Sequence, residues 1–379
     1  MPGQNLLARI DLFAEPEVVL TDSKYWTPGF ARLFIESWDD VSYRDPHAGK
    51  ILAEVAVKLV AHLDKESQEV LGPCARAILG SSYRAIGELA EASFHLESVL
   101  AEYRARLLPR LDEARCYRRM AYLRMDQSRF CEAIEFADKN ITLCRAEWTN
   151  HEVGVGYTVL GAIYLQMVLS EDLVPKGEPT HSLSCALELI DSRKSVSAYE
   201  ATFCNLSLAL LEGYPLEPQH ALGCIRKAQK LQANSRITRK TLPGSQLRWI
   251  LGLVHLRSGA THRAEVTLRR VSRVLKDLGY LGHYSRVSLD LAEVYHRQGQ
   301  WGRLRILAEE ILTLEGVCSK DGLAALRVWC KAIRKGEVDT NTWERVLRTV
   351  RWPPQAPVGR LRKARSPSRR KSPQDLALW

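Results

Sequence analysis

The chain has 379 residues, and its 54 Lys and Arg against 44 Asp and Glu give a formal charge of +10. Its 46% hydrophobic and 26% charged residues are typical of globular proteins and exclude a wholly disordered or fibrous chain. No segment approaches the roughly 18 to 20 uninterrupted apolar residues of a membrane-spanning helix. Because Arg9 and Asp11 interrupt the apolar start before a signal-peptide core forms, we expect a soluble protein that is not exported.

Cysteine usage points to a reducing compartment. The nine cysteines are an odd number and include no CxxC pair, so neither a secreted disulfide scaffold nor a structural zinc site fits. Most of them stand among apolar residues, where a thiol behaves as a small hydrophobic side chain. We therefore predict reduced, mostly buried thiols in a cytoplasmic protein.

Residues 28 to 65 read as helices with apolar stripes, such as Phe30, Leu33 and Phe34 and then Val55 and Leu59. This segment predicts a divergent helical cap, which we assign to residues 1–66.

A repeat follows the cap. Six helical-looking segments each place a small residue after an apolar one, and these small residues recur every 40 to 46 positions, at Gly80, Ala121, Gly161, Ser207, Gly252 and Ala292. Such a period is the mark of a repeat architecture. We assign residues 67–352 to this repeat array.

The clearest unit starts at Leu247, where one helix pattern ends at Gly259 and a second carries Ala264, Leu268 and Val271 at three- and four-residue spacing. Two antiparallel helices joined by a short turn approach closely only where side chains are small, which explains Gly252 and Ala264. Since one such pair cannot bury its apolar face alone, neighbouring pairs must stack.

The units resemble the tetratricopeptide repeat (TPR), a helix-turn-helix of about 34 residues with a Leu-Gly, Tyr, Gly, Ala pattern. Leu79-Gly80, Tyr83, Gly87 and Ala92 carry the likeness in one unit, and Leu251-Gly252, Gly259 and Ala264 carry it in another. In style the chain is similar to uncharacterised bacterial TPR proteins and to the TPR sensor arrays of some bacterial regulators, although it shows no helix-turn-helix DNA reader ahead of its array. The resemblance implies an all-α, right-handed superhelical solenoid of six to seven helix pairs.

The sequence departs from the family pattern in two places. The polar stretch after Leu169 delays the second helix of the third unit to about Ser184–Asp191, and residues 213–218 make a shorter interruption in the fourth. A degenerate seventh pair, LAALRVWCKAIRKG and NTWERVLRTV, closes the predicted array.

In similar proteins the first helix of each repeat lines a concave groove that binds protein or peptide ligands. Carrying over those positions gives Arg115, Arg118, Arg119, Tyr122, Asn205, Leu208, Gln246, Trp249, Leu253, Arg257, Arg286, Leu289, Asp290, Glu293 and Arg297. Arginines suit acidic partners because guanidinium binds carboxylates bidentately. Two alternatives stay open: the arginines pair with acids of neighbouring helices or solvate a helix face, and Trp249 packs in the core instead of anchoring a partner.

The last segment, residues 353–379, has no apolar periodicity before its final residues and predicts a disordered tail. Residues 356–379 hold seven basic residues against Asp375, namely Arg360, Arg362, Lys363, Arg365, Arg369, Arg370 and Lys371. The tail thus carries +6 of the +10 charge. It could be solubilising only, contact nucleic acid phosphates, or touch an anionic membrane or acidic protein.

A search for catalytic chemistry favours no enzyme. His151-Glu152 lacks the second histidine of a zinc-protease helix, and Gly154 and Gly156 fit helix packing better than a phosphate loop. His255 and His296 occupy related repeat positions without a shared metal-ligand partner, and the paired carboxylates fit solvated helix faces. We therefore predict a non-catalytic protein- or peptide-binding scaffold without cofactor or metal, or alternatively a regulatory factor that contacts nucleic acid through its tail.

Overall fold

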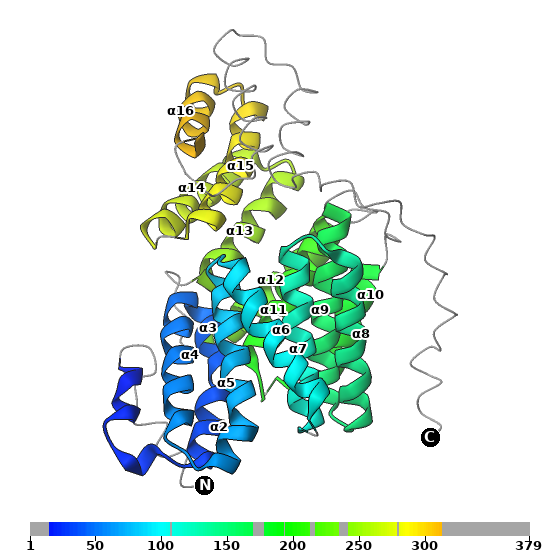
Figure 1. Cartoon of the computed structure of the whole chain (residues 1–379). Coiled ribbons are helices and arrows are strands. Elements are labelled where there is room, and N and C mark those ends of the chain that lie inside the picture. The colour runs from blue at the N-terminus through cyan, green and yellow to red at the C-terminus, as the bar shows by residue number, and fades with distance from the viewer. Residues whose placement is uncertain are drawn as a thin grey trace, which may run out of the picture.

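The computed structural model describes residues 15–106, 108–169, 178–192, 194–212, 217–234, 242–278 and 280–312. Within these ranges the chain forms helices and no β-strand, which confirms the predicted all-α class. Figure 1 shows the helices as a curved stack that runs from the blue N-terminal helices to α16 at the opposite end. None of the helices in the described ranges is both long and apolar enough to cross a membrane.

The described part begins with a cap of short helices, which we define as residues 15–61. Its elements are the 3-10 helices η1 (Pro16–Leu20) and η2 (Ser23–Tyr25) and the α-helices α2 (Pro28–Glu36), α3 (Trp38–Arg44) and α4 (Pro46–Ala61). The helices predicted over residues 28 to 65 are thus present, with breaks at Ser37 and Asp45 that the periodicity did not indicate.

Local capping fixes where two of these helices begin. The Thr27 side chain accepts a hydrogen bond from the backbone N–H of Phe30, and the Asp45 side chain accepts from those of His47 and Ala48. Each of these two N-cap residues is followed by a proline. Proline suits the first helical turn because a backbone N–H at that position would have no partner within the helix. Asp45 therefore ends α3 and starts α4.

The cap has its own core, and Trp38 joins it to the array. The side chains of Phe30 and Phe34 are fully or almost fully buried, and Trp38 is 5% exposed. The indole Nε1 of Trp38 donates to the Gly49 carbonyl at 3.0 Å and to the Ser82 hydroxyl of α5 at 2.8 Å. The cap is therefore packed against the first repeat by a satisfied polar contact within an apolar core.

Within the described ranges, six helix pairs follow the cap, at the positions that the small-residue spacing predicted. They are α5 (Lys65–Ala85) with α6 (Leu89–Ala105), α7 (Arg110–Asp126) with α8 (Phe130–Ala146), α9 (Asn150–Leu169) with α10 (Glu178–Leu189), α11 (Val196–Glu212) with α12 (Pro218–Asn234), α13 (Leu242–Arg257) with α14 (Thr261–Asp277), and α15 (Leu281–Arg297) with α16 (Trp301–Leu312). The second helix of the third pair, α10, begins at Glu178, so the prediction that it starts near Ser184 was wrong. Pro179 lies in the first turn of α10, where proline is well tolerated. From the sequence alone, the same proline indicates a loop, which explains the late predicted start.

Close approach within a pair explains the repeated small residues. A Cβ added at Gly161 would lie 2.5 Å from Leu183 Cγ, and one at Gly252 would lie 2.6 Å from Leu268 Cδ2. Both distances are below van der Waals contact, so only glycine allows these helices to pack at this separation. Gly154 and Gly156 of α9 face α10 and α8 in the same way, which confirms their assignment to helix packing.

The turns between paired helices use left-handed backbone. Gly87, Gly259 and Gly299 have positive φ between the helices of their pairs, and Ser128 takes the same conformation in the second pair. Trp148, in the turn between α8 and α9, also has a positive φ of 52° although it is not glycine. Such a residue is strained, because its Cβ crowds the backbone.

The layers of the array follow from helix contacts. Each first helix touches the next first helix, from α5 through α7, α9, α11 and α13 to α15. Successive second helices such as α12 and α14 make no comparable contact in the described ranges. Because helices on the inside of a curved stack lie closer together, the first helices form the concave layer. We call their inner face the groove.

The predicted seventh pair and the predicted tail lie outside the described residues. So do Cys318 and Cys330. The other seven cysteines are free thiols, of which five are buried, while Cys131 is exposed and Cys185 is partly exposed. The prediction of mostly buried, unpaired cysteines is therefore confirmed for the part of the chain that the structure covers.

Candidate functional site

The predicted groove residues lie on the first helices of their pairs, and the arginines of α7 form the densest charged cluster. Arg115 Nη2 lies 2.8 Å from Glu152 Oε1 of α9, and Arg118 Nη1 lies 3.0 Å from Glu152 Oε2. Nearby, Arg32 of α2 pairs with Asp112 of α7 at 2.8 Å. The acids of neighbouring helices thus pair with the groove arginines, as one of the two sequence interpretations held.

Charge and burial set the protonation of this cluster. Burial alone would raise the pKa of the Glu152 carboxyl, but the charges of Arg118 and Arg115 outweigh it and lower that pKa to about 2. Glu152 is therefore a permanent anion near neutral pH. Its two guanidinium partners are held in place between α7 and α9.

The third arginine, Arg119, is less well compensated. Its side chain is 11% exposed, and its Nη2 lies 3.8 Å from Asp39 Oδ1. Its Nε has no hydrogen-bond partner among the described residues, and its guanidinium carbon lies 5.6 Å from the centre of the Trp38 ring. Burial lowers the pKa of Arg119, and the like charges of Arg118 and Arg115 add to this effect while Asp39 opposes it. Arg119 is therefore a buried cation whose nearest carboxylate, that of Asp39, is at the long end of ion-pair distance.

Helix α3 of the cap lies across this groove. Among the array helices it contacts the first helices α5, α11 and α13, and Figure 1 shows it behind the front helices, next to α13 and α11. Asp39 Oδ2 of α3 lies 3.1 Å from Arg118 Nη2. α3 also contacts α11, where Asp40 accepts a hydrogen bond from the Ser197 hydroxyl at 2.5 Å. Tyr43 of α3 lies near Glu200 of α11.

Glu200 forms a buried polar contact on the groove floor. It is fully buried, and the Gln232 amide of α12 donates to its Oε1. Burial raises the pKa of the Glu200 carboxyl, although the hydrogen bond from Gln232 and the nearby Tyr43 hydroxyl oppose the shift. The α3 segment ends at Asp45, whose carboxylate accepts from the Tyr280 hydroxyl just before α15 at 3.3 Å. The cap therefore spans the groove from α7 to the last described pair.

The C-terminal half of the groove has a second polar cluster. The Trp249 indole of α13 donates to Asp290 Oδ2 of α15 at 2.5 Å, and Arg257 Nη1 lies 3.3 Å from Glu293 Oε1. Glu293 also pairs with Arg297 at 2.5 Å, and Gln246 lies 3.3 Å from His283. Trp249 is half-buried and packs against the apolar cores on both sides of α13. The Trp249 ring therefore packs in the core, as one sequence alternative held, while its indole N–H makes a polar contact to the neighbouring helix α15.

The remaining predicted groove residues divide by burial. Leu253 and Leu289 are buried in the core, whereas Tyr122, Asn205 and Leu208 are partly exposed. Arg286 lies on α15, but its side chain is outside the described set. The basic tail residues Arg360, Arg362, Lys363, Arg365, Arg369, Arg370 and Lys371 also lie outside the described residues.

Sequence reasoning missed the residues that the cap contributes. Asp39, Asp40 and Tyr43 stand on a seven-residue helix with no repeat signature, and Glu152 was considered only as part of a motif. The signal that could have found them is the run Trp38-Asp39-Asp40 between two proline-started helices, because adjacent acids ahead of an arginine-rich groove invite pairing.

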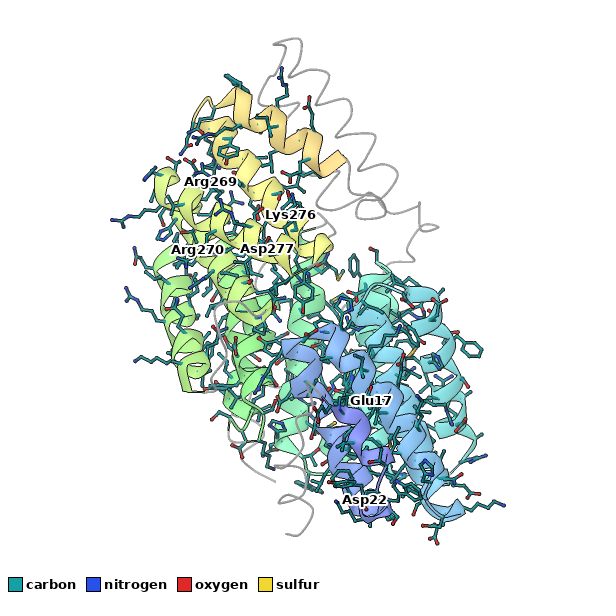
Figure 2. The ribbon with its side chains drawn as sticks, turned by 90° about the vertical axis from the view of Figure 1, so that its left-hand side faces the viewer. Glu17, Asp22, Arg269, Arg270, Lys276 and Asp277 are labelled. Carbon is teal, nitrogen blue, oxygen red and sulfur yellow. The ribbon has the colours of Figure 1, made fainter. Side chains whose placement is uncertain are left out.

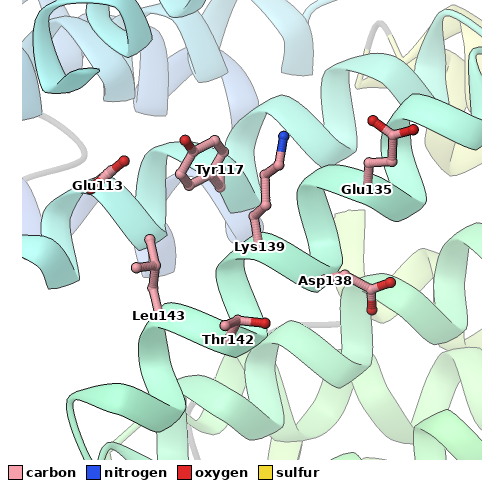
Figure 3. Close-up of a pocket in the computed structure, with 7 residues that line it drawn as sticks. All are labelled: Glu113, Tyr117, Glu135, Asp138, Lys139, Thr142 and Leu143. Atoms are coloured by element: carbon pink, nitrogen blue, oxygen red, sulfur yellow. The ribbon is translucent and has the colours of Figure 1, made fainter. Parts of the chain in front are cut away.

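A shallow cavity of about 540 Å³ lies between α7 and α8, outside the arginine cluster (Figure 3). Its walls include Glu113, Glu135, Asp138 and Lys139, and the Lys139 ammonium lies 5.8 Å from the centre of the Tyr117 ring. In the described part of the chain, no group of three or more His, Cys, Asp and Glu side chains is arranged to hold a metal ion. His151, the start of the rejected protease motif, accepts a hydrogen bond from the backbone N–H of Asp191 and so joins α9 to the end of α10.

Comparison with solved structures supports the repeat fold. A Rap protein complexed with competence and sporulation factor matches with a TM-score of 0.61 at 11% identity, over 84% of this chain and 86% of that one. The apo form of RapI matches with a TM-score of 0.50 at 14% identity, over 81% and 99% of the two chains. A third structure, aspartyl phosphate phosphatase F from Bacillus subtilis, has a TM-score of 0.44, which is too low to carry an argument.

No family model matches the sequence, and no curated protein matches it either. At these low identities the structural likeness concerns the fold alone. It confirms that the chain is a TPR-like helical repeat protein.

Proposed function

We propose that this protein is a non-catalytic scaffold that binds a protein or peptide of acidic character in its groove. The observation that supports this most directly is the seating of α3: the groove already holds a helical segment through an ion pair between Arg118 and Asp39 and a hydrogen bond between Ser197 and Asp40. A groove built in this way recognises extended or helical chains. Because the first helices are packed against one another, it loses little entropy when a ligand binds.

The ionisable groups of the groove suit recognition better than catalysis. A general base works best when its pKa lies near the working pH, but the pKa of Glu152 is about 2 and both its oxygens are bound to arginines. Arginine is charged at every physiological pH and presents fixed donor geometry to carboxylates. The cluster therefore offers binding and specificity, not proton transfer.

We place this activity in the cytoplasm, since free thiols are typical of a reducing compartment and the seven described cysteines are all unpaired. The structural relative that was solved with competence and sporulation factor gives a precedent for a ligand-bound form of this fold. Nucleic-acid contact through the basic tail involves residues that are not described and is not part of this proposal.

Photo-crosslinking tests the proposal with positional precision. A photoreactive amino acid is placed at Gln246 or Arg257 in the groove, and at Arg270 on the outer helix α14 as a control. Arg270 is exposed, and Figure 2 shows it beside Arg269, on the same helix as Lys276. Full-length variants are crosslinked in the native host, and the products are identified by mass spectrometry.

We expect the same partner from both groove positions and not from Arg270. That partner should compete with its own purified peptide fragments. A partner captured equally well from Arg270, or no partner from either groove position, would contradict groove binding.

A further inference from the structure

We propose that α3 is a built-in mimic of the partner, and that the partner binds by putting a carboxylate in the place of Asp39. This inference rests on the proposed function and names both the partner chemistry and the way in which access is controlled. The ligand class is an acidic peptide segment with adjacent carboxylates, as Asp39 and Asp40 present them.

The charges around α7 show what the cap contributes. Four arginines, Arg32, Arg115, Arg118 and Arg119, meet four carboxylates within ion-pair distance. Two of these carboxylates, Asp112 and Glu152, belong to the array itself. The other two, Glu36 and Asp39, come from the end of α2 and the start of α3. The cap also contributes Arg32, so without the cap the three arginines of α7 face two array carboxylates and keep an excess of one positive charge.

The Asp39 carboxylate is well placed for exchange. Its side chain is 50% exposed, so solvent and ligands reach it, whereas the side chain of Arg118 is 9% exposed. Its neighbour Trp38 is anchored in the core through Gly49 and Ser82. A ligand can therefore displace the groove side of α3 at the cost of the half-exposed Asp39 ion pair and the exposed Asp40 hydrogen bond, without extracting the indole from the core.

The groove side of α3 defines the recognised pattern. Asp39 reaches Arg118 of α7, and Asp40 reaches Ser197 of α11. Tyr43 follows Asp40 by three positions and Asp39 by four, which places it on the same side of the helix as each of them. The residues of α3 that face the cap core, Val41 and Ser42, are buried instead. The partner needs to reproduce only the first set.

A labelled peptide of residues 36–45, ESWDDVSYRD, serves as the probe, and fluorescence anisotropy measures its dissociation constant with the full-length chain. Asp39→Asn removes the competing charge at a half-exposed position and should leave the fold intact, which a thermal melt checks. We expect the peptide to bind Asp39→Asn about tenfold more tightly than the wild type, because a larger fraction of the variant has a free site. Glu135→Gln on α8 makes the same change of charge outside the groove and should match the wild type.

The peptide itself provides a second control. A version with the aspartates at positions 39 and 40 replaced by asparagine should bind at least about tenfold more weakly. Hydrogen exchange of the wild-type chain should show faster exchange in α3 once the peptide is bound.

Equal affinity of wild type and Asp39→Asn, equal affinity of the two peptides, or an α3 that stays protected in the complex would each overturn the mimicry proposal. So would the absence of any peptide binding to either chain. Crosslinking at Gln246 and Arg257 would still report groove binding in all these cases, so the two proposals fail separately.

Discussion

Arg118 of α7 lies 3.1 Å from Asp39 of α3, although 79 positions separate the two residues in the sequence. The same guanidinium reaches Glu152 at 3.0 Å. One buried arginine thus joins the cap, the second repeat and the third repeat. Breaking either contact should affect both the stability of the array and its access to ligands.

Glu152 should make stability depend on pH in the acidic range. Its folded-state pKa, about 2, lies below its ordinary value of 4.5, so its contribution is fully present above pH 4.5 and is lost as the pH falls towards 2. Glu152→Gln lacks this contribution at every pH. The difference in unfolding free energy between wild type and variant, measured by urea denaturation, should reach up to about 3 kcal/mol near neutral pH and shrink with acidification. A constant difference between about pH 6 and pH 3 would contradict the assignment.

Gly161 tests the close packing within a helix pair. A Cβ at this position would meet Leu183 Cγ at 2.5 Å, so Gly161→Ala should lower the unfolding free energy by about 1–3 kcal/mol through overpacking. Gly223 of α12 has no heavy atom within 4 Å of an added Cβ. Gly223→Ala should therefore be neutral or stabilise by up to about 1 kcal/mol, because alanine favours helix. Similar losses in both variants would exclude the steric explanation.

Trp148 offers a stabilising substitution. It has a φ of +52° and its side chain is 89% exposed, so Trp148→Gly removes backbone strain and loses little packing. We expect a gain of about 1 kcal/mol in thermal or urea denaturation. Gly259, with a φ of +74°, is the reciprocal control, and Gly259→Ala should destabilise by a similar amount. A destabilised Trp148→Gly would indicate that the indole makes contacts that stabilise the fold.

Thiol alkylation should separate the cysteines by environment. Cys131 is exposed, whereas burial raises the pKa of Cys116 to about 12 and that of Cys144 to about 11. Brief treatment with iodoacetamide near neutral pH, followed by peptide mass spectrometry, should label Cys131 at least about 100-fold faster than Cys116. Denaturant should abolish this difference. Rapid labelling of Cys116 in the folded chain would contradict its burial.

The repeat architecture could be predicted because its causes are local. Gly252 and Leu268 lie only 16 positions apart in the sequence. A close approach between a glycine of the first helix and a leucine of the second also occurs in other helix pairs. The position of α10 was less predictable, since Pro179 reads equally well as a loop residue or as the first turn of a helix.

The arrangement of the groove could be predicted only in part. Helix periodicity and the TPR likeness brought Arg115, Arg118 and Arg119 to the first helices, but nothing in their sequence neighbourhood indicated that Asp39 would reach them. That contact depends on how far the array curves and on where the cap folds back. Leu253, which a carried-over position placed towards a ligand, is buried because apolar residues on the inner layer fill the space between first helices.

The hydrogen bond from Tyr280 to Asp45 connects residues 235 positions apart. Solenoids usually gain stability only from adjacent repeats, so they can melt piecewise from either end. A link between the cap and the sixth pair raises the mean sequence separation of contacts, which is associated with slower folding. A substitution that destabilises the cap should therefore also destabilise the sixth helix pair. This solenoid should therefore unfold more as a single cooperative unit than an open array of the same length.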